Sequence, residues 1–199
     1  MILIDNNDLE IIFIRHGLTT NNLSGRFGGS TDYELSNEGR EALKQIHNNY
    51  PFPDVDKIFS SPATRAIQTS NIIFPNKDVV IVKDLRELDF GLAEGELTSE
   101  IAKKYEDVFQ HWQNPTLDFS FPEGETFSEC LIRARKAMDF VILDAIENEL
   151  SLIAVISHSV ILSLLLKAHL DTSRDEERLC PNGMGYLVRT SKEGWFNQR

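Results

Sequence analysis

The feature that most constrains the fold is an uninterrupted apolar run in the second half of the chain, 152–156, with the sequence Leu-Ile-Ala-Val-Ile. A strand that is apolar at every position is buried on both faces, which is typical of a central strand in a parallel sheet. A similar run, Ile11 to Ile14, lies near the start of the chain. These two runs predict an α/β fold: a three-layer sandwich in which helices cover both faces of a mainly parallel central sheet.

Shorter signals fill in the rest of this fold. Three more segments are expected to be strands, the last of them a closing edge strand: 56–60, 79–82 and 185–190. Capping residues predict one helix after Ser36, and the capping-box spacing of Thr126 and Glu129 predicts a long amphipathic helix. Segments 21–30 and 98–123 are expected to be irregular, the first because of its Gly, Asn and Ser content and the second because of its prolines and scattered aromatic residues.

Composition limits the class of protein. With 199 residues and 41% hydrophobic content, the chain is expected to form a single domain over residues 1–199. The net charge of −11 argues against a nucleic-acid partner. No apolar run is long enough for a membrane span, and residues 1–5 lack the pattern of a signal peptide. The two distant cysteines favour free thiols, so we expect a cytoplasmic protein. We also expect it to be a monomer or a homodimer.

Polar residues with matching chemistry follow the two central strands. Arg15, His16 and Gly17 come directly after the first strand, and Ser157-His158-Ser159 follows the 152–156 strand. The carboxyl ends of parallel strands meet at one edge of the sheet, where ligands bind. A guanidinium can hold phosphoryl oxygens and an imidazole can attack phosphorus, so these residues predict a phosphoryl site.

Two further stretches offer partners for this site. Ser61 is expected to cap a helix with Pro62 at its first position, which puts Arg65 in the first turn at the same sheet edge. A cation is unfavourable at a helix N-terminus, and a bound anion would explain its presence. Glu87 follows the third strand, where a carboxyl group could protonate a leaving oxygen.

Three points stay open from the residues alone. The stretch around Glu87 contains four acidic residues, so chemistry alone does not select Glu87. The loop that contains Gly28 and Gly29 could offer backbone N–H groups to an anion, or could be an ordinary surface loop. The aromatic segment at about 95–125 could be a cap over the site, or packing for the helix that follows.

Four blocks of sequence, in this order, resemble the histidine phosphatase superfamily, the phosphoglycerate-mutase-like group. They are Arg15-His16-Gly17-x-Thr19-x-x-Asn22, Ser60-Ser61-Pro62-x-x-Arg65-Ala66-x-Gln68-Thr69, Leu85-x-Glu87-x-x-Phe90-Gly91-x-x-Glu94-Gly95 and Ser157-His158. The resemblance implies that His16 is the nucleophile that becomes phosphorylated. It implies that Glu87 first donates a proton to the leaving group and then activates water.

The resemblance also implies binding roles, without a metal or other cofactor. The residues expected to hold the phosphoryl group by side chain are Arg15, Asn22, Arg65 and His158, with Gly28 and Gly29 contacting substrate through the backbone. Two positions depart from the common pattern: Leu18 replaces a frequent glutamate, and Ser159 replaces the usual glycine and adds a hydroxyl near the phosphate. We expect burial near the site to raise the pKa of Glu87.

Within this family the residues favour a phosphatase acting on a small phosphorylated metabolite. Mutases carry an arginine directly after the acid, where this chain has Leu88, and they carry a basic insertion, where this chain has only Lys103 and Lys104. Residues 85–91 and 122–126 are similar to the α-ribazole phosphatases, which makes α-ribazole 5′-phosphate one candidate substrate. The alternatives are a cofactor-dependent phosphoglycerate mutase and a catalytically weak regulator that binds a phosphorylated ligand.

Overall fold

The fold is built on one five-stranded sheet with the order β3-β2-β4-β1-β5. The structure is a computed structural model that describes residues 9–113, 115–169 and 180–190. The strands are β1 (Leu9–Arg15), β2 (Lys57–Ser60), β3 (Val79–Ile81), β4 (Leu152–Ser157) and β5 (Gly185–Thr190). The first four are parallel to their neighbours, and β5 pairs antiparallel with β1 at the edge. The predicted strands and the mainly parallel sheet are therefore confirmed.

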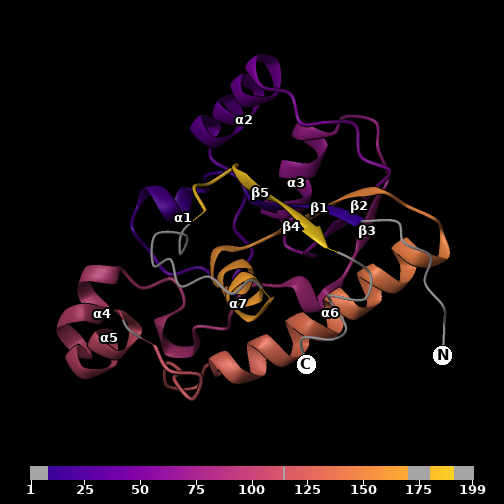
Figure 1. Cartoon of the computed structure of the whole chain (residues 1–199). Helices are drawn as coiled ribbons and strands as arrows, with labels where there is room; N and C mark the ends of the chain where they lie inside the picture. The colour runs from indigo at the N-terminus through magenta and orange to yellow at the C-terminus, as the bar shows by residue number, and fades with distance from the viewer. Residues whose placement is uncertain (1–8, 114, 170–179, 191–199) are drawn as a thin grey trace, which may run out of the picture.

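Helices cover both faces of the sheet, as Figure 1 shows. On one face, Ile12 and Ile14 of β1 pack in a cluster with residues of α2 (Asn37–Asn49) and α3 (Thr64–Ile73). On the other face, Ile11 and Phe13 pack with residues of α6 (Phe127–Glu147) and α7 (Ser159–His169). This alternation explains why β1 is apolar at successive positions, and it confirms the predicted three-layer α/β sandwich.

The carboxyl ends of β1, β2 and β4 meet at one edge of the sheet. Arg15 pairs with Ser157 in the β1–β4 register, and the His16 N–H donates to the Ser157 carbonyl at 3.0 Å. The N–H of Ser61, which follows β2, donates to the carbonyl of Ile156 at 2.9 Å. The strand register therefore places the backbone of His16, Ser61 and His158 side by side at this edge of the sheet.

The capping predictions for two helices are confirmed. The Ser36 side chain accepts a hydrogen bond from the Gly39 N–H at the start of α2. Thr126 and Glu129 form a complete capping box at the start of α6. Such a cap stabilises a helix by about 1 kcal/mol, because it satisfies N–H groups that have no partner within the helix.

The predicted start of α3 is wrong. The helix begins at Thr64, and its N-cap is Ala63, which makes no side-chain capping bond. Ser61 instead accepts a hydrogen bond from the Ala63 N–H at 3.3 Å and shares another with the ring of His158. Ser61 bonds to His158, which is 97 positions away in the chain. Local capping preference cannot predict a bond to so distant a residue.

The two segments predicted to be irregular contain short helices. They are α1 (Thr20–Leu23) in the first segment, and α4 (Thr98–Lys104) and α5 (Glu106–Gln113) in the second. The first residue of α4 follows Leu97, which makes no capping bond, whereas Ile101 of α4 and Trp112 of α5 pack against the main core. These helices depend on tertiary packing, so weak local signals do not reveal them.

The signal-peptide prediction concerns residues 1–5, which lie outside the described residues. No helix in the described part of the chain is both long and apolar enough to cross a membrane. Cys130, which lies within α6, and Cys180 are both free thiols, as expected from the sequence.

Candidate active site

His16 lies buried at the carboxyl end of β1, with 5% of its surface exposed. Its Nδ1 is 2.7 Å from the Gly17 carbonyl oxygen. A carbonyl can only accept, so Nδ1 carries the hydrogen and Nε2 keeps its lone pair when the ring is neutral. Burial, together with the cations Arg65 and Arg15, lowers the pKa of His16 from 6.5 to about 3. At neutral pH the ring is therefore an uncharged base with a free nitrogen.

His158 lies beside His16 with none of its surface exposed. The two ring centroids are 5.1 Å apart at an angle of 61°. His158 Nε2 is hydrogen-bonded to the Ser61 hydroxyl at 2.7 Å, while its buried Nδ1 has no hydrogen-bond partner among the described residues. Burial, the nearby Arg65 and His16 hold the pKa of His158 well below its usual range. An unsatisfied buried nitrogen next to the nucleophile fits a contact with a ligand oxygen.

Arg15 and Asn22 add hydrogen-bond donors to the same place. Arg15 Nη1 donates to the Cys180 carbonyl at 2.9 Å, while its buried Nε has no partner in the part of the chain that the structure describes. The Asn22 side-chain oxygen accepts from the Thr19 N–H and from Asn182 Nδ2, both at 3.3 Å. That leaves the NH₂ group of Asn22, for which no partner is found among the described residues, as a donor for a ligand.

Arg65 stabilises the loop that contains Gly28 and Gly29 through hydrogen bonds to its backbone carbonyls. Its guanidinium donates to the carbonyls of Thr31 at 3.0 Å, of Gly29 at 2.9 Å and of Gly28 at 3.4 Å, and Arg65 is 1% exposed. These carbonyls provide the negative partners that a cation in the first turn of α3 requires. A bound anion is therefore not needed to explain Arg65 at that position.

Glu94 holds the same loop through its N–H groups. Its carboxylate accepts from the backbone N–H groups of Gly29, Ser30 and Thr31, and from Phe90 N–H. Burial opposes ionisation, but these hydrogen bonds outweigh it and lower the pKa of Glu94. The Gly29 N–H already donates to Glu94, and a Cβ at position 29 would clash with the Leu88 carbonyl. Gly29 is therefore needed for the conformation of the loop. We therefore expect backbone contact with substrate at Gly28, which lines the cavity.

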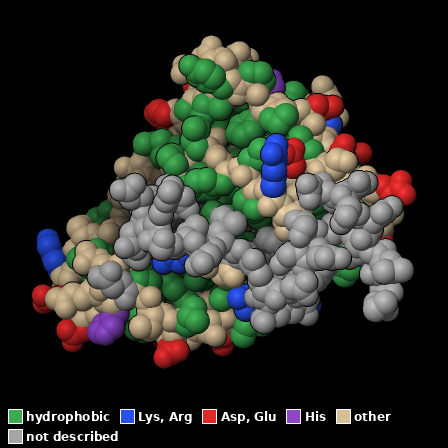
Figure 2. Space-filling model, viewed as in Figure 1, with side chains coloured by type: hydrophobic (Ala, Val, Ile, Leu, Met, Phe, Trp, Pro, Cys, Tyr) green, Lys and Arg blue, Asp and Glu red, His purple; other side chains and the backbone are tan. Residues whose placement is uncertain are grey.

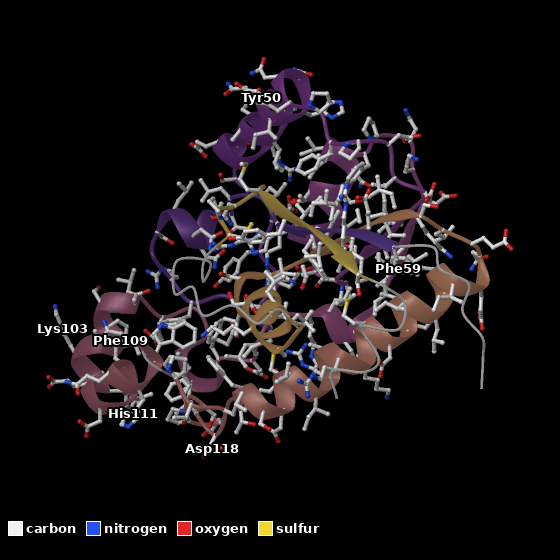
Figure 3. The ribbon with its side chains drawn as sticks, in the orientation of Figure 1. Tyr50, Phe59, Lys103, Phe109, His111 and Asp118 are labelled. Atoms are coloured by element: carbon white, nitrogen blue, oxygen red, sulfur yellow. The ribbon has the colours of Figure 1, made fainter. Side chains whose placement is uncertain are left out.

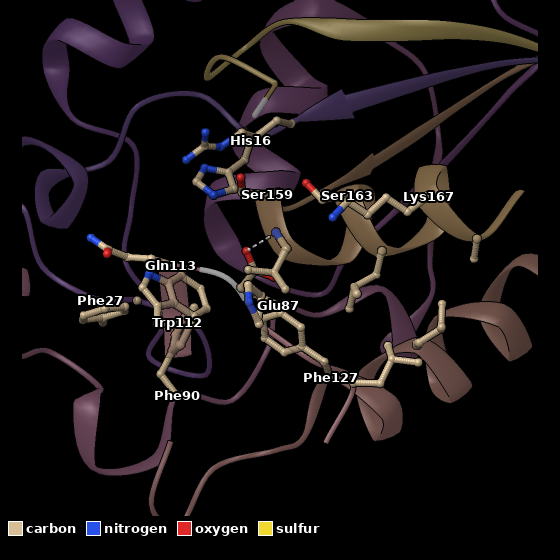
Figure 4. Close-up of a pocket in the computed structure, with 18 of the residues that line it drawn as sticks. His16, Phe27, Glu87, Phe90, Trp112, Gln113, Phe127, Ser159, Ser163 and Lys167 are labelled. Carbon is tan, nitrogen blue, oxygen red and sulfur yellow. Dashed lines mark hydrogen bonds between the residues drawn. The ribbon is translucent and has the colours of Figure 1, made fainter. Parts of the chain in front are cut away.

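Glu87 is the one acidic residue of its stretch that lines the cavity beside His16. Its carboxylate accepts from the N–H groups of Leu88 at 3.0 Å, of Val160 at 3.2 Å and of Ile161 at 3.3 Å, the last two at the start of α7 (Figure 4). Burial raises the pKa of Glu87 more than these bonds and the two nearby arginines lower it. The predicted direction of the pKa shift is confirmed.

The other three acidic residues of that stretch have different partners. Asp84 accepts from Arg86 at 3.1 Å, Asp89 accepts from the Gly91 N–H at 2.9 Å, and Glu94 holds the glycine loop. The structure thus distinguishes among four carboxyl groups that sequence chemistry left equivalent.

A cavity of about 730 Å³ opens next to His16 and Glu87. One wall is aromatic, with ring centroids 5.1–5.9 Å apart in a chain of contacts through Phe27, Phe90, Trp112 and Phe127. Figure 4 shows these rings across the pocket from Ser159, Ser163 and Lys167 of α7. Figure 2 shows hydrophobic side chains between the α4–α5 hairpin and the start of α6, bordered by Lys and Arg side chains. The cavity is thus lined by polar and charged residues near His16 and by an apolar aromatic wall.

The cavity also contains residues that the sequence did not identify. Arg26, Arg135 and Lys167 line it, and they lie far apart in the chain. The lysines that the sequence did single out are not in the lining: Lys103 extends from the outer side of the α4–α5 hairpin (Figure 3). Ser159, Ser163 and Lys167 lie four residues apart on one helix, and this spacing is a local signal that could have linked Lys167 to Ser159. The spacing says nothing of Arg26 or Arg135.

Ser159 takes the place of the family's usual glycine without backbone strain. It starts α7, lines the cavity, and is not among the described residues with positive φ. The helical start therefore does not require a glycine at this position.

The chain belongs to the histidine phosphatase superfamily, branch 1, whose family model matches residues 11–198. This places the cavity beside His16, and the adjacent His158, in a phosphatase and mutase superfamily. Phosphoserine phosphatase 1 of Hydrogenobacter thermophilus is 28% identical over 135 residues, which cover 67% of this chain and 64% of that enzyme. The chain spans only 32% of the length of two other curated relatives.

Solved structures show the same fold. The phosphoglycerate mutase of Bacillus anthracis superposes with a TM-score of 0.78 at 19% identity, covering 98% of both chains. The α-ribazole phosphatase of Shigella flexneri superposes with a TM-score of 0.74 at 20% identity, covering 92% of this chain and 94% of that chain. At these identities the likeness concerns the fold alone.

Proposed function

We propose that the protein is a phosphomonoesterase that acts through a phosphohistidine intermediate, without a metal, on a small phosphorylated metabolite. The observation that carries this proposal is the setting of His16: its ring is neutral, is oriented by the Gly17 carbonyl, lies 5.1 Å from the ring of His158, and lines the same cavity as Arg15 and Glu87. Phosphoryl transfer depends mainly on positioning and charge stabilisation, and these groups supply both.

The reaction proceeds in two steps. In the first, His16 Nε2 forms a bond to phosphorus while the bond to the leaving oxygen breaks, and protonated Glu87 gives that oxygen its proton. The raised pKa of Glu87 favours the protonated form that this step needs. In the second step, Glu87 takes a proton from water as the water attacks phosphorus, and the His16–phosphorus bond breaks. Arg15, Arg65, Asn22 and His158 are the proposed stabilisers of the phosphoryl charge.

A phosphatase fits the residue after the acid better than a mutase does. Leu88 has none of its surface exposed and packs in the main core, so this position presents no cation to a second substrate group. The particular substrate rests on resemblance: α-ribazole 5′-phosphate is the first natural ester to assay, given the similar sequence stretches and the α-ribazole phosphatase fold neighbour. A mutase would instead exchange phosphate between hydroxyls of a phosphoglycerate, and a regulator would bind without turnover.

The test is release of phosphate from 4-nitrophenyl phosphate in the presence of EDTA. We expect His16→Ala to lower kcat by roughly a thousandfold or more, as removal of a nucleophile does. The matched control is His111→Ala, which removes an exposed histidine on α5. Acid-labile, alkali-stable label on the wild type after quenching with a ³²P-labelled ester, absent in His16→Ala, identifies the phosphohistidine. Full turnover by His16→Ala contradicts the proposal.

A further inference from the structure

The cavity contains more positive charge than one phosphoryl group requires. Among its described lining residues are four cations, Arg15, Arg26, Arg135 and Lys167, and a single carboxyl group, Glu87. The chain as a whole carries a net charge of −11, so this excess of cations is a local property of the cavity. Charge of this kind attracts an anionic ligand and favours its binding over a neutral one.

Two of these cations are free for a ligand. Arg135 comes from α6 and Lys167 from α7, and neither forms an ion pair in the described part of the chain. The Nε of Arg135 is buried, and no described residue forms a hydrogen bond with it. Arg26 differs from them, because its Nη1 already donates to the Gly95 carbonyl at 2.8 Å.

Arg135 and Lys167 come from α6 and α7, whereas Arg15 and His16 lie at the carboxyl end of β1. Lys167 follows Ser159 by eight residues on the same helix, which corresponds to about 12 Å along the axis. Figure 4 shows Ser159, Ser163 and Lys167 on one side of the pocket, with Ser159 next to His16. The opposite wall consists of aromatic rings, including Trp112 and Phe127. A ligand with a flat or apolar organic part and a second anion besides its phosphate would match this lining.

We propose that Arg135 and Lys167 form a second anion subsite, and that the cavity is selective for esters with two anionic groups. The preferred substrate is a phosphomonoester whose compact apolar or aromatic part carries a carboxylate or a second phosphate. This inference rests on the proposed phosphatase function and specifies its substrate class. It ranks such esters above α-ribazole 5′-phosphate, whose organic part is a nucleoside without a second anion.

The experiment compares matched aryl phosphates. The pair is 4-carboxyphenyl phosphate and 4-carbamoylphenyl phosphate, which have the same shape but differ in the charge of the far substituent; 1,4-phenylene bisphosphate tests a second phosphate. The enzymes are the wild type, the Arg135→Gln/Lys167→Gln double variant, and Lys136→Gln, which removes an exposed cation one position along α6. Dividing the kcat/KM ratio of the two esters in a variant by that in the wild type cancels the difference in leaving-group reactivity.

We expect the wild type to prefer the carboxylate over the carboxamide by roughly tenfold or more, mainly in KM, as charge-assisted hydrogen bonds predict. The double variant should reduce this ratio about tenfold, while Lys136→Gln should keep it. A larger preference for the bisphosphate than for the carboxylate would identify phosphate as the second anion, and the reverse would identify carboxylate.

Two other results separate the possible failures. If the wild type turns over both esters equally, or the ratio survives in the double variant, the subsite is refuted while the phosphatase stands. If the carboxamide ester is turned over equally by wild type and His16→Ala, the proposed function itself fails.

Discussion

Arg133 of α6 offers the sharpest test of how the fold positions the proposed acid. Its guanidinium donates to the backbone carbonyls of Asp84 at 2.9 Å, of Arg86 at 2.6 Å and of Glu87 at 3.0 Å. It also forms a two-pronged ion pair with Glu125, at 2.6 and 2.7 Å, with 9% and 12% of the two side chains exposed. Arg133 therefore fixes the backbone that carries Glu87, and it is a positioning residue in our interpretation.

We predict that Arg133→Met lowers the free energy of unfolding by about 3–5 kcal/mol. Removing one partner of a buried ion pair leaves the other charge desolvated, and this costs about that much. For a chain of this length, each kcal/mol lowers Tm by about 2–4 °C, so a fall of roughly 10 °C is expected. Activity should fall in kcat rather than KM, because the loop of Glu87 would lose its alignment while the phosphoryl-binding groups would stay.

Urea and thermal unfolding at pH 7 measure the first effect, and steady-state kinetics measure the second. Arg133→Lys is the informative companion, since it keeps the charge but cannot form the fork. Lys136→Met is the control for losing a cation from α6 at an exposed position. In a double-mutant cycle, Glu125→Gln should add little to Arg133→Met, because the two residues share one interaction. A loss below about 1 kcal/mol, or fully additive effects, would refute this reasoning.

Three more predictions follow from the buried polar groups. Because the folded pKa of His16 lies below its value in the unfolded chain, stability is lost as pH falls below about 6.5; relative to His16→Gln, the wild type should lose about 2 kcal/mol between pH 8 and pH 5, and equal slopes would contradict the lowered pKa. Glu94→Gln should destabilise the protein by about 1–3 kcal/mol in urea unfolding and raise KM severalfold, since it weakens acceptance from the N–H groups of the glycine loop; an unchanged KM would show that this loop does not shape the site. Ser61→Ala should cost about 1–2 kcal/mol and reduce kcat, with Ser60→Ala as the control, because only Ser61 bonds to His158; an unaltered kcat would remove Ser61 from the positioning of that ring.

The sequence by itself determined the sheet and the residues at its carboxyl edge. The runs that became β1 and β4 are apolar throughout, so burial on both faces and the polar residues at their ends could be predicted from local pattern. His16 and His158 were found in this way, as were the caps at Ser36 and Thr126. These features depend on residues that lie close together in the chain.

The tertiary structure decided the roles that depend on distant partners. Local sequence predicts a helix cap at Ser61, whereas in the fold Ser61 bonds to the ring of His158. The chemistry of its acidic stretch does not single out Glu87, whereas the start of α7 packs against Glu87 and does. Arg135 and Lys167 entered the cavity only when α6 and α7 packed together. Local periodicity does not predict such contacts, because the packing of whole helices and strands determines which side chains line one cavity.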